Sequence, residues 1–556
     1  MNLSGLSNPP FGSGTCVTVA AAFDAAALRW ADRPFVEVLP ETAAIYGMVP
    51  ALLAYAPAAM AVAQLRAGYA AAGYGHGHRV GLLLDNRPSF LLHWFALNGL
   101  GVSVVPINAD LRAAELEYLV SHSEIVLAVA LQPRHADLLR AAEASGRGLA
   151  LMADGDRPPP ATEPPPLASR APDVDSECAL LYTSGTTGRP KGCILSNRYF
   201  LLAGAWYAGL DGLAALRPGE DRMLTPLPLV HMNAMACSTM AMVLTGGCLV
   251  LLDRFHPRTW WDSVRASGAT VVHYLGVMPA MLMKAQAAPA DRAHQVRFGF
   301  GAGVARPLHT PFEQRFGFPL LEAWAMTETG AGATIIAQRD PRQPGTSCFG
   351  QEPENVEVRL VADDGQEAAV DQPGELWVRR RGANPRYGFF TAYLKDPQAT
   401  DEAWADGWFH TGDIVTRDAQ QQLHFVDRRK NVIRRSGENI SAVEVESVLQ
   451  QHPLVHAAAV AAVPDPVRGD EVLACIVAPT LSADPAARTD AAREIVSWCL
   501  ERLAYYKAPA YVAFVDALPL TASQKVARGD LRLLAAGLPG QAHCIDTHAM
   551  KKRGAG

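Results

Sequence analysis

A stretch rich in glycine, serine and threonine, residues 181–192, has the residue types of a phosphate-binding loop. Its small residues let backbone N–H groups and hydroxyls surround phosphate oxygens, and Lys191 adds a positive charge. The spacing from Gly185 to Lys191 differs from the Walker pattern, in which the lysine directly follows the second glycine. A flexible surface turn is the alternative, but twelve residues in this order, after an apolar strand, favour phosphate binding. The candidate residues are Thr183, Ser184, Gly185, Thr186, Thr187, Gly188 and Lys191.

Four further stretches contain residues suited to nucleotide chemistry: 322–328, 408–413, 427–440 and 519–526. Glu328 and Asp413 are carboxylates, which can hold a hard cation or accept hydrogen bonds from hydroxyls. Lys525 can place a positive charge where two anions must meet. Each residue alone also suits an ordinary role, a solvated surface acid or a solubilising lysine. The order of the stretches therefore carries the argument.

In this order, the five stretches resemble the signature motifs of the adenylate-forming superfamily, which includes acyl-CoA synthetases, luciferases and peptide-synthetase adenylation domains. The resemblance spans roughly residues 15 to 535. Residues 434–441 and 506–509 look most similar to the subgroup of carnitine/crotonobetaine-CoA ligases. The resemblance implies ATP, Mg²⁺ and coenzyme A as cofactor and cosubstrates. It also implies a large multi-sheet N-terminal domain and a small α+β C-terminal domain on a hinge.

The resemblance also implies roles for the nucleotide-site residues. Glu328 would hold Mg²⁺, Thr327 would donate to a phosphate oxygen, and Asp413 would accept from both ribose hydroxyls. The remaining members of this set are Trp324, stacked on adenine; Gly301, Ala302 and Gly303, along the adenosine; and Arg428, near the nucleotide.

Other residues would act on the acid and on coenzyme A. His231 would guard the carboxylate, and Ala325 would narrow the acyl entrance. Lys525 would be the catalytic lysine between the carboxylate and the α-phosphate. Ser436 and Gly437 would face the pantetheine arm after the C-terminal domain turns about its hinge at Lys430. Gln524, Asn431, Ala323 and Ala325 depart from the usual motifs without removing a reacting group.

The expected acyl-site segments, 229–243 and 274–283, contain no acidic residue and several methionines, and His231 and the adjoining His273 are the possible cations. Adaptable apolar walls favour a short or medium, mostly uncharged acid. The predicted reaction is AMP-forming acid–CoA ligation. Three alternatives stay open: a luciferase-like oxidase, an adenylating enzyme that loads a carrier protein, and a silent nucleotide-binding protein.

Apolar runs alternate with helix-like stretches, as in 80–84, 89–98 and 102–107, which predicts an α/β fold. A charged connector near residue 428 divides the chain into expected domains 1–427 and 428–556. Beyond it, the pattern Ser441 to Glu444 predicts a helix that ends before Pro453, followed by a strand over 455–463. The segment from Gly537 is expected to be a loosely ordered tail.

The composition excludes several classes of protein. A net charge of −6 without a long basic stripe argues against nucleic acid as a partner. Nine scattered cysteines without a CxxC pair, and no signal peptide, favour the reducing cytoplasm. The long uncharged run 223–252 contains prolines and a Gly-Gly pair, so it predicts a buried helix followed by a strand rather than a membrane span. The predicted partners are the carboxylic acid, ATP and coenzyme A, with a homodimer left open.

Overall fold

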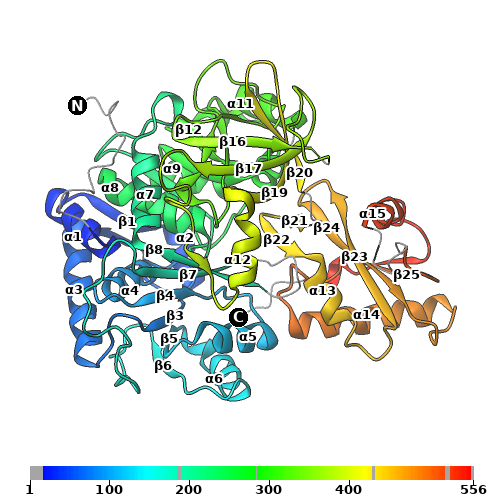
Figure 1. Cartoon of the computed structure of the whole chain (residues 1–556), viewed down its shortest axis with the longest axis horizontal. Helices are drawn as coiled ribbons and strands as arrows, with labels where there is room; N and C mark the ends of the chain where they lie inside the picture. Colours follow the sequence, from blue (N-terminus) through cyan, green and yellow to red (C-terminus); the bar gives the residue numbers. More distant parts are fainter. Residues whose placement is uncertain are drawn as a thin grey trace.

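The computed structural model describes residues 17–183, 190–283, 285–304, 306–362, 364–428, 432–519, 526 and 528–551. These residues form four β-sheets with helices packed on them (Figure 1). Among these residues, none of the helices combines the length and the hydropathy that a membrane crossing requires.

The largest sheet has eight strands, parallel in its interior and antiparallel only at its two ends. Its order is β14 (Ile335–Ile336), β13 (Leu320–Trp324), β12 (Phe298–Ala302), β11 (Val271–Leu275), β9 (Arg222–Thr225), β10 (Cys248–Leu251), β1 (Pro34–Val38) and β2 (Ala51–Ala54). One face packs against α9 (Trp260–Ser267), α10 (Val277–Met283) and α11 (Arg306–Phe316). Helices on both faces explain why its strands are almost uniformly apolar.

The second sheet has seven strands and is parallel except at β8 and β18. Its order is β18 (Ala392–Tyr393), β8 (Lys191–Ser196), β7 (Glu177–Thr183), β4 (Ser103–Pro106), β3 (Arg79–Leu83), β5 (Leu127–Ala130) and β6 (Ala150–Ala153). Helices α5 (Ala113–Ser123) and α6 (His135–Ala144) cover one face.

The main hydrophobic core lies between these two sheets. The helices that contribute to it are α1 (Val19–Arg29), α3 (Tyr55–Ala71), α4 (Pro88–Asn98), α7 (Asn197–Ala208) and α8 (Thr239–Thr245). Its aromatic centre includes Phe23 and Phe95, whose ring centroids are 4.4 Å apart. Close packing of this kind gives the sheets a fixed relative position, so the strand ends can hold side chains in place.

A third sheet of five antiparallel strands carries the 408–413 stretch. Its order is β15 (Cys348–Gln351), β20 (Gln422–Arg428), β19 (Phe409–Arg417), β17 (Gly374–Arg380) and β16 (Val356–Val361). Short helices α2 (Pro40–Tyr46) and α12 (Pro397–Ala403) complete the α-helices of the described residues before 428.

The fourth sheet is built from residues beyond 431 and lies at one side of the molecule, orange to red in Figure 1. Its strands are β22 (Glu438–Ser441), β21 (Val432–Arg435), β24 (Gly469–Val477), β25 (Tyr511–Phe514), β26 (Cys544–Asp546) and β23 (Ala457–Asp465). Helices α13 (Ala442–Leu449) and α14 (Pro485–Arg502) share one core with it, and α15 (Arg528–Ala536) packs on β23. We call residues 432–551 the C-terminal module.

The predicted α/β class and the pairing of a large with a small α+β unit are confirmed. Strands and helices appear where the patterns placed them: β3, α4 and β4 in the first part, α13 and β23 in the last. The run 223–252 contains the predicted helix and strand, α8 and β10, preceded by β9 and a short π-helix. The boundary at 428 stays a prediction, because Lys430 lies outside the described residues.

The expectation of a loose tail from Gly537 is wrong for residues 537–551. Strand β26 pairs with β25, and Leu538, Ile545 and Met550 pack into the cores of the C-terminal module. The glycines and the proline at 537–540 concealed these apolar contacts, which only the tertiary structure reveals.

A buried carboxylate anchors the end of this segment. Glu471 accepts hydrogen bonds from Arg435 Nε and from Lys551 Nζ, the latter at 2.7 Å, and the side chains are at most 3% exposed. Burial raises the pKa of Glu471, but the two cations outweigh it and hold the pKa below its usual value. Burial and the repulsion from Arg435 lower the pKa of Lys551 to about 8. Two buried cations therefore share one carboxylate, and Arg468 Nη1 also reaches its Oε1, at 3.4 Å.

Because several cations share one carboxylate, removing the carboxylate and removing one cation should lower the free energy of unfolding by different amounts. Glu471→Gln leaves Arg435 and Lys551 buried without an anion, and we expect it to lower the free energy of unfolding by about 3–5 kcal/mol. Lys551→Met leaves the Arg435–Glu471 pair intact and should cost on the order of 1 kcal/mol. Urea unfolding followed by circular dichroism measures both. Equal losses would show that Glu471 is not the centre of the cluster.

Candidate active site

A cavity of about 1150 Å³ opens between the large sheets and the C-terminal module. The ends of β7, β11, β12 and β13 contribute to its wall, and so do Gly437, Glu438, Glu444 and Lys507 of the C-terminal module. Parallel strands commonly present ligand sites at their carboxyl ends. The volume exceeds that of most single-ligand pockets, which suits more than one substrate.

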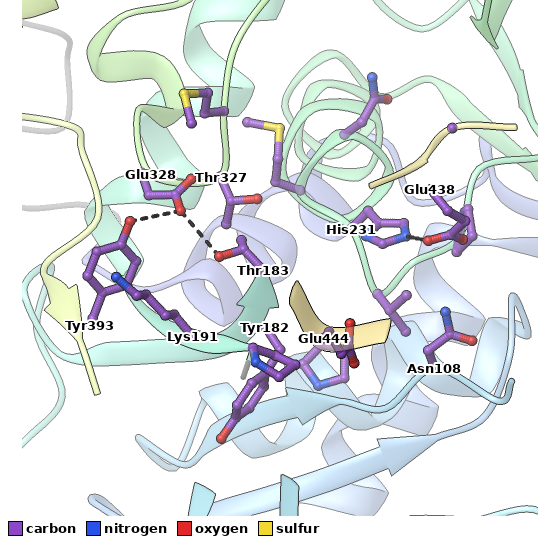
Figure 2. Close-up of a pocket in the computed structure, with 18 of the residues that line it drawn as sticks. Asn108, Tyr182, Thr183, Lys191, His231, Thr327, Glu328, Tyr393, Glu438 and Glu444 are labelled. Atoms are coloured by element: carbon purple, nitrogen blue, oxygen red, sulfur yellow. Dashed lines mark hydrogen bonds and ion pairs between the residues drawn. The ribbon is translucent and has the colours of Figure 1, made fainter. Parts of the chain in front are cut away.

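Glu328 is the charged centre of one end of the cavity (Figure 2). Its Oε1 accepts hydrogen bonds from Thr183 Oγ1 at 3.2 Å and from Tyr393 Oη at 3.0 Å. Burial first, and then the Glu328 charge, raise the pKa of Tyr393, so the phenol keeps its proton and remains a donor. The Nζ of Lys191 lies 4.7 Å from the Tyr393 ring centroid. The structure thus brings together three predicted residues from β7, β8 and the loop after β13.

This arrangement fits a magnesium ion shared with phosphates. The two hydroxyls at Glu328 are neutral, and within the described part of the chain the carboxylate forms no ion pair. Nor does any group of three or more possible metal ligands occur among these residues. Mg²⁺ is commonly held by one or two carboxylates together with substrate phosphates. Residues 184–188, the centre of the predicted loop, lie outside the described residues.

Trp324 and Asp413 are brought together from different sheets. Trp324 Nε1 donates to Asp413 Oδ2 at 2.8 Å, and the two side chains are buried. Arg428 is the cross-strand partner of Asp413 between β19 and β20. The described lining of the cavity contains their neighbours Ala323, Ala325 and Gly412 rather than Trp324 and Asp413 themselves. Stacking on adenine and ribose binding therefore stay predictions.

The stretch 301–303 follows β12 at the same edge. Gly301 and Ala302 border the cavity, as do Ala325 and Thr327. A Cβ at Gly301 would lie 2.2 Å from the carbonyl oxygen of Tyr274, so only glycine permits the close approach of β11 and β12. Gly303 has φ +81°, a left-handed conformation that favours glycine.

The turn between β21 and β22 extends to the opposite end of the cavity. Ser436 and Gly437 have positive φ, and Gly437 borders the cavity next to Leu275. The Ser436 N–H donates to the carbonyl of Arg468 at 2.9 Å, which holds the turn against the rest of the C-terminal module. Of the two predicted coenzyme A residues, Gly437 thus faces the predicted acyl site, whereas Ser436 is not part of the described lining. Lys430 and Lys525 lie outside the described residues.

His231 and Glu438 form a contact across this end (Figure 2). His231 Nε2 lies 3.6 Å from Glu438 Oε2, and the histidine side chain is 43% exposed because it borders the cavity. Burial lowers the pKa of His231, but Glu438 outweighs it, and the net shift is upward. Burial raises the pKa of Glu438, but His231 outweighs it, and the net shift is downward. The two shifts agree, since each favours the charged form of its group.

A second contact, which we call the Lys507 cluster, consists of Lys507, Glu115 and Glu444. Lys507 Nζ lies 2.6 Å from Glu115 Oε1 on α5 and 2.8 Å from Glu444 Oε1 on α13, and all three side chains are at most 9% exposed. Burial lowers the pKa of Lys507, but the two carboxylates outweigh it and raise the pKa. One ammonium therefore links the C-terminal module to the second sheet.

Sequence reasoning missed several of these residues. Tyr393 and Glu115 carry no motif, and only their spatial contacts reveal them. Lys507 and Glu438 lie inside stretches that resembled a known subgroup, but nothing in the sequence indicates their partners.

Comparison with known proteins identifies the chain. Residues 23–387 match the AMP-binding enzyme family, and residues 444–525 match the AMP-binding enzyme C-terminal domain. The chain belongs to the AMP-binding enzymes.

Curated relatives cover almost all of this AMP-binding enzyme. It is 32% identical to sulfoacetate–CoA ligase of Cupriavidus necator, over 93% of the chain and 97% of the relative. It is 31% identical to crotonobetaine/carnitine–CoA ligase of Escherichia coli, over 83% of the chain and 89% of the relative. These matches confirm the predicted superfamily and the predicted class of reaction, AMP-forming acid–CoA ligation.

The fold also matches solved structures. A double mutant of o-succinylbenzoate CoA synthetase from Bacillus subtilis, bound with its product analogue, has a TM-score of 0.75 at 23% identity. The alignment covers 92% of this chain and 98% of that one.

The Lys507 cluster predicts that loss of its single cation weakens the contact between the C-terminal module and α5. Lys507→Met leaves Glu115 and Glu444 facing each other without a cation, so the contact between the C-terminal module and α5 should lose about 3–5 kcal/mol. Fluorescence energy transfer between labels on Leu139→Cys and Leu533→Cys, two exposed positions on α6 and α15, measures the contact. Glu115→Gln is the matched control, because it leaves one cation and one anion and should weaken the contact less. Equal effects of the two variants would contradict the assignment.

The His231–Glu438 pair predicts a pH window for the same contact. Because the pKa of His231 is raised above 6.5, its contribution is complete below pH 6.5 and is lost as the pH rises through the higher value. Because the pKa of Glu438 is lowered below 4.5, its contribution is present above pH 4.5 and is lost at more acidic pH. Energy transfer between the same labels should therefore decline on the alkaline side. Glu438→Gln should abolish that decline, and an unchanged profile in this variant would refute the role of the pair.

Proposed function

We propose that this AMP-binding enzyme activates a short or medium, mostly uncharged carboxylic acid with ATP and transfers the acyl group to coenzyme A. The observation that carries the proposal is the polarity of the cavity. Glu328, Lys191 and two hydroxyls occupy one end, and His231, Leu275 and Gly437 occupy the other. The first end suits a metal-bound phosphate chain, and the second suits an acyl group and a thiol.

In the first step, a carboxylate oxygen attacks the α-phosphorus, and the bond from that phosphorus to pyrophosphate breaks. Two anions must approach each other, so positive charge is needed where they meet. Lys191 supplies charge from the cavity wall, and Lys525 is proposed to supply it from the C-terminal module. Mg²⁺ held by Glu328 would neutralise phosphate oxygens when it is bound.

In the second step, the sulfur of coenzyme A attacks the acyl carbon of the adenylate, AMP leaves with the bonding electrons, and the thiol proton is released. This step needs an open approach for the thiol rather than a further cation. Gly437 supports such an approach, because its missing side chain keeps the turn close to Leu275. We propose that the C-terminal module presents Lys525 in the first step and Gly437 in the second.

The curated relatives are named for sulfoacetate and for crotonobetaine or carnitine. Eight described cysteines are free thiols, which suits the cytoplasm. Whether the enzyme forms a homodimer is tested by measuring its molar mass in solution, which should be twice that of the chain for a dimer.

The reaction is tested by a screen of carboxylic acids for pyrophosphate release, followed by chromatography of the products. The proposal requires both an acid-dependent release of pyrophosphate and a free acyl-CoA. Pyrophosphate release without acyl-CoA, but with loading of a carrier protein, would show a carrier-loading enzyme instead.

Two substitutions should separate the half-reactions. Lys525→Ala should slow adenylate formation by orders of magnitude, yet convert ready-made acyl-adenylate and coenzyme A to thioester at a near-normal rate. Gly437→Leu should form adenylate but little thioester, because a Cβ there would lie 2.0 Å from Leu275 Cδ1.

Gly540→Leu is the matched control, since Gly540 also has positive φ and its Cβ would meet nothing within 4 Å. It should preserve the ratio of the two rates. If Lys525→Ala and Gly437→Leu slow both steps equally, alternation of the C-terminal module is wrong for this enzyme.

A further inference from the structure

A short π-helix, Asn233–Ser238, lies in the wall of the cavity beside the predicted acyl site. It begins two residues after His231, and Asn233 itself borders the cavity. The side chains of its first and last residues both form hydrogen bonds with one side chain, that of His273 on β11. His273 Nδ1 lies 2.7 Å from Asn233 Oδ1 and 2.9 Å from Ser238 Oγ. π-Helices of this length are rare and often occur at functional sites.

The buried end of this network determines where its protons lie. Tyr207 Oη lies 3.0 Å from His273 Nε2, and both residues are fully buried. Within the described residues Tyr207 has no other acceptor for its proton, so it donates to Nε2 and the imidazole carries its hydrogen on Nδ1. The contacts of Ser238 support this assignment of the hydrogen to Nδ1. The Ser238 hydroxyl donates to the carbonyl of Asn233 at 3.2 Å, so it can only accept a hydrogen bond from His273. Burial lowers the pKa of His273 to about 3, so the ring stays neutral.

A histidine that donates from Nδ1 fixes the amide of Asn233. The amide must present its oxygen to His273, which leaves its N–H donors for the cavity. The described residues provide no hydrogen-bond acceptor for this nitrogen. The wall around it is mostly apolar and includes Met232, Leu275 and Phe300. A donor in apolar surroundings costs free energy unless a ligand or water accepts from it.

We propose that Asn233 donates a hydrogen bond to an oxygen on the acyl chain, so that the substrate is a short acid with a hydroxyl or carbonyl oxygen. This proposal rests on the proposed ligase function. The acceptor is neutral, because His273 is uncharged and His231 is engaged by Glu438 in this arrangement. Asn233 is two positions after His231 in the sequence, so the oxygen is a few carbons from the reacting carboxylate.

Pairs of acids test the assignment. Each pair consists of a five- or six-carbon acid with a hydroxyl or carbonyl at its third or fourth carbon and the same acid with a methylene there. The measured quantity is the ratio of kcat/KM within a pair, from pyrophosphate release. The wild-type ratio should be about 10 to 100 in favour of the oxygenated acid for at least one pair, as for an amide donor that loses its acceptor.

Asn233→Leu, which has a similar volume, should reduce that ratio to near one. Tyr207→Phe should reduce it partly, because the imidazole can then shift its proton and the amide can turn. A purely structural loss would lower both rates of a pair and leave their ratio unchanged. Asn108→Leu is the matched control, because it removes the same group from another part of the cavity wall and should keep the wild-type ratio.

The outcomes distinguish the two proposals. A ratio near one in every wild-type pair, or a ratio that survives Asn233→Leu, would overturn the role of Asn233 while the ligase activity stands. Absence of pyrophosphate release with every acid would overturn the proposed function and this inference with it.

Discussion

Lys507 is buried between two carboxylates from distant parts of the chain, and the shape of the cavity depends on this contact. Glu115 belongs to α5 of the second sheet, whereas Glu444 and Lys507 belong to the C-terminal module. When the three groups meet, the turn at Gly437 lies against Leu275 and Glu438 lies beside His231. A buried ion pair gains little net free energy, because desolvation offsets most of the attraction. Removal of one partner is nevertheless costly, because it leaves a buried charge without a counter-ion, so the contact favours this arrangement of the three groups over a displaced one.

The two ends of the cavity differ in how they treat charge. Around Glu328 the partners are neutral hydroxyls with Lys191 near by, so a cation bound to phosphates would find a carboxylate not already neutralised. Around Asn233 the wall is apolar, and its histidine is held neutral by burial. Electrostatic interactions are strong in such low-dielectric surroundings. An anionic substituent on the acyl chain would therefore lose its hydration there without gaining a counter-charge.

The fold and the class of reaction could be predicted from the sequence, but most side-chain contacts of the site could not. The alternation of strands and helices is a local pattern, and the motif residues are recognisable because each lies in a fixed short order. The contact of Lys507 with Glu115 joins residues 392 positions apart, and Trp324 meets Asp413 across 89 positions. Neither contact is indicated by the residues next to it in the sequence. The prediction of a loose tail after Gly537 was wrong for the same reason. The glycines of this segment are visible in the local sequence, whereas the ion pair of Lys551 with Glu471 joins residues that are far apart in the chain.

The acid and the reaction step are controlled by separate parts of this site. Asn233, Ser238, His273 and Tyr207 all belong to the large sheets and their helices, so the donor at Asn233 does not depend on the C-terminal module. His231 is only two residues away, yet its charge depends on Glu438, which that module provides. In the proposed alternation of the C-terminal module, the acyl chain is therefore selected before Glu438 lies beside His231. Only the surroundings of the carboxylate change with the module, because the donor at Asn233 and the histidine that orients it lie outside the module.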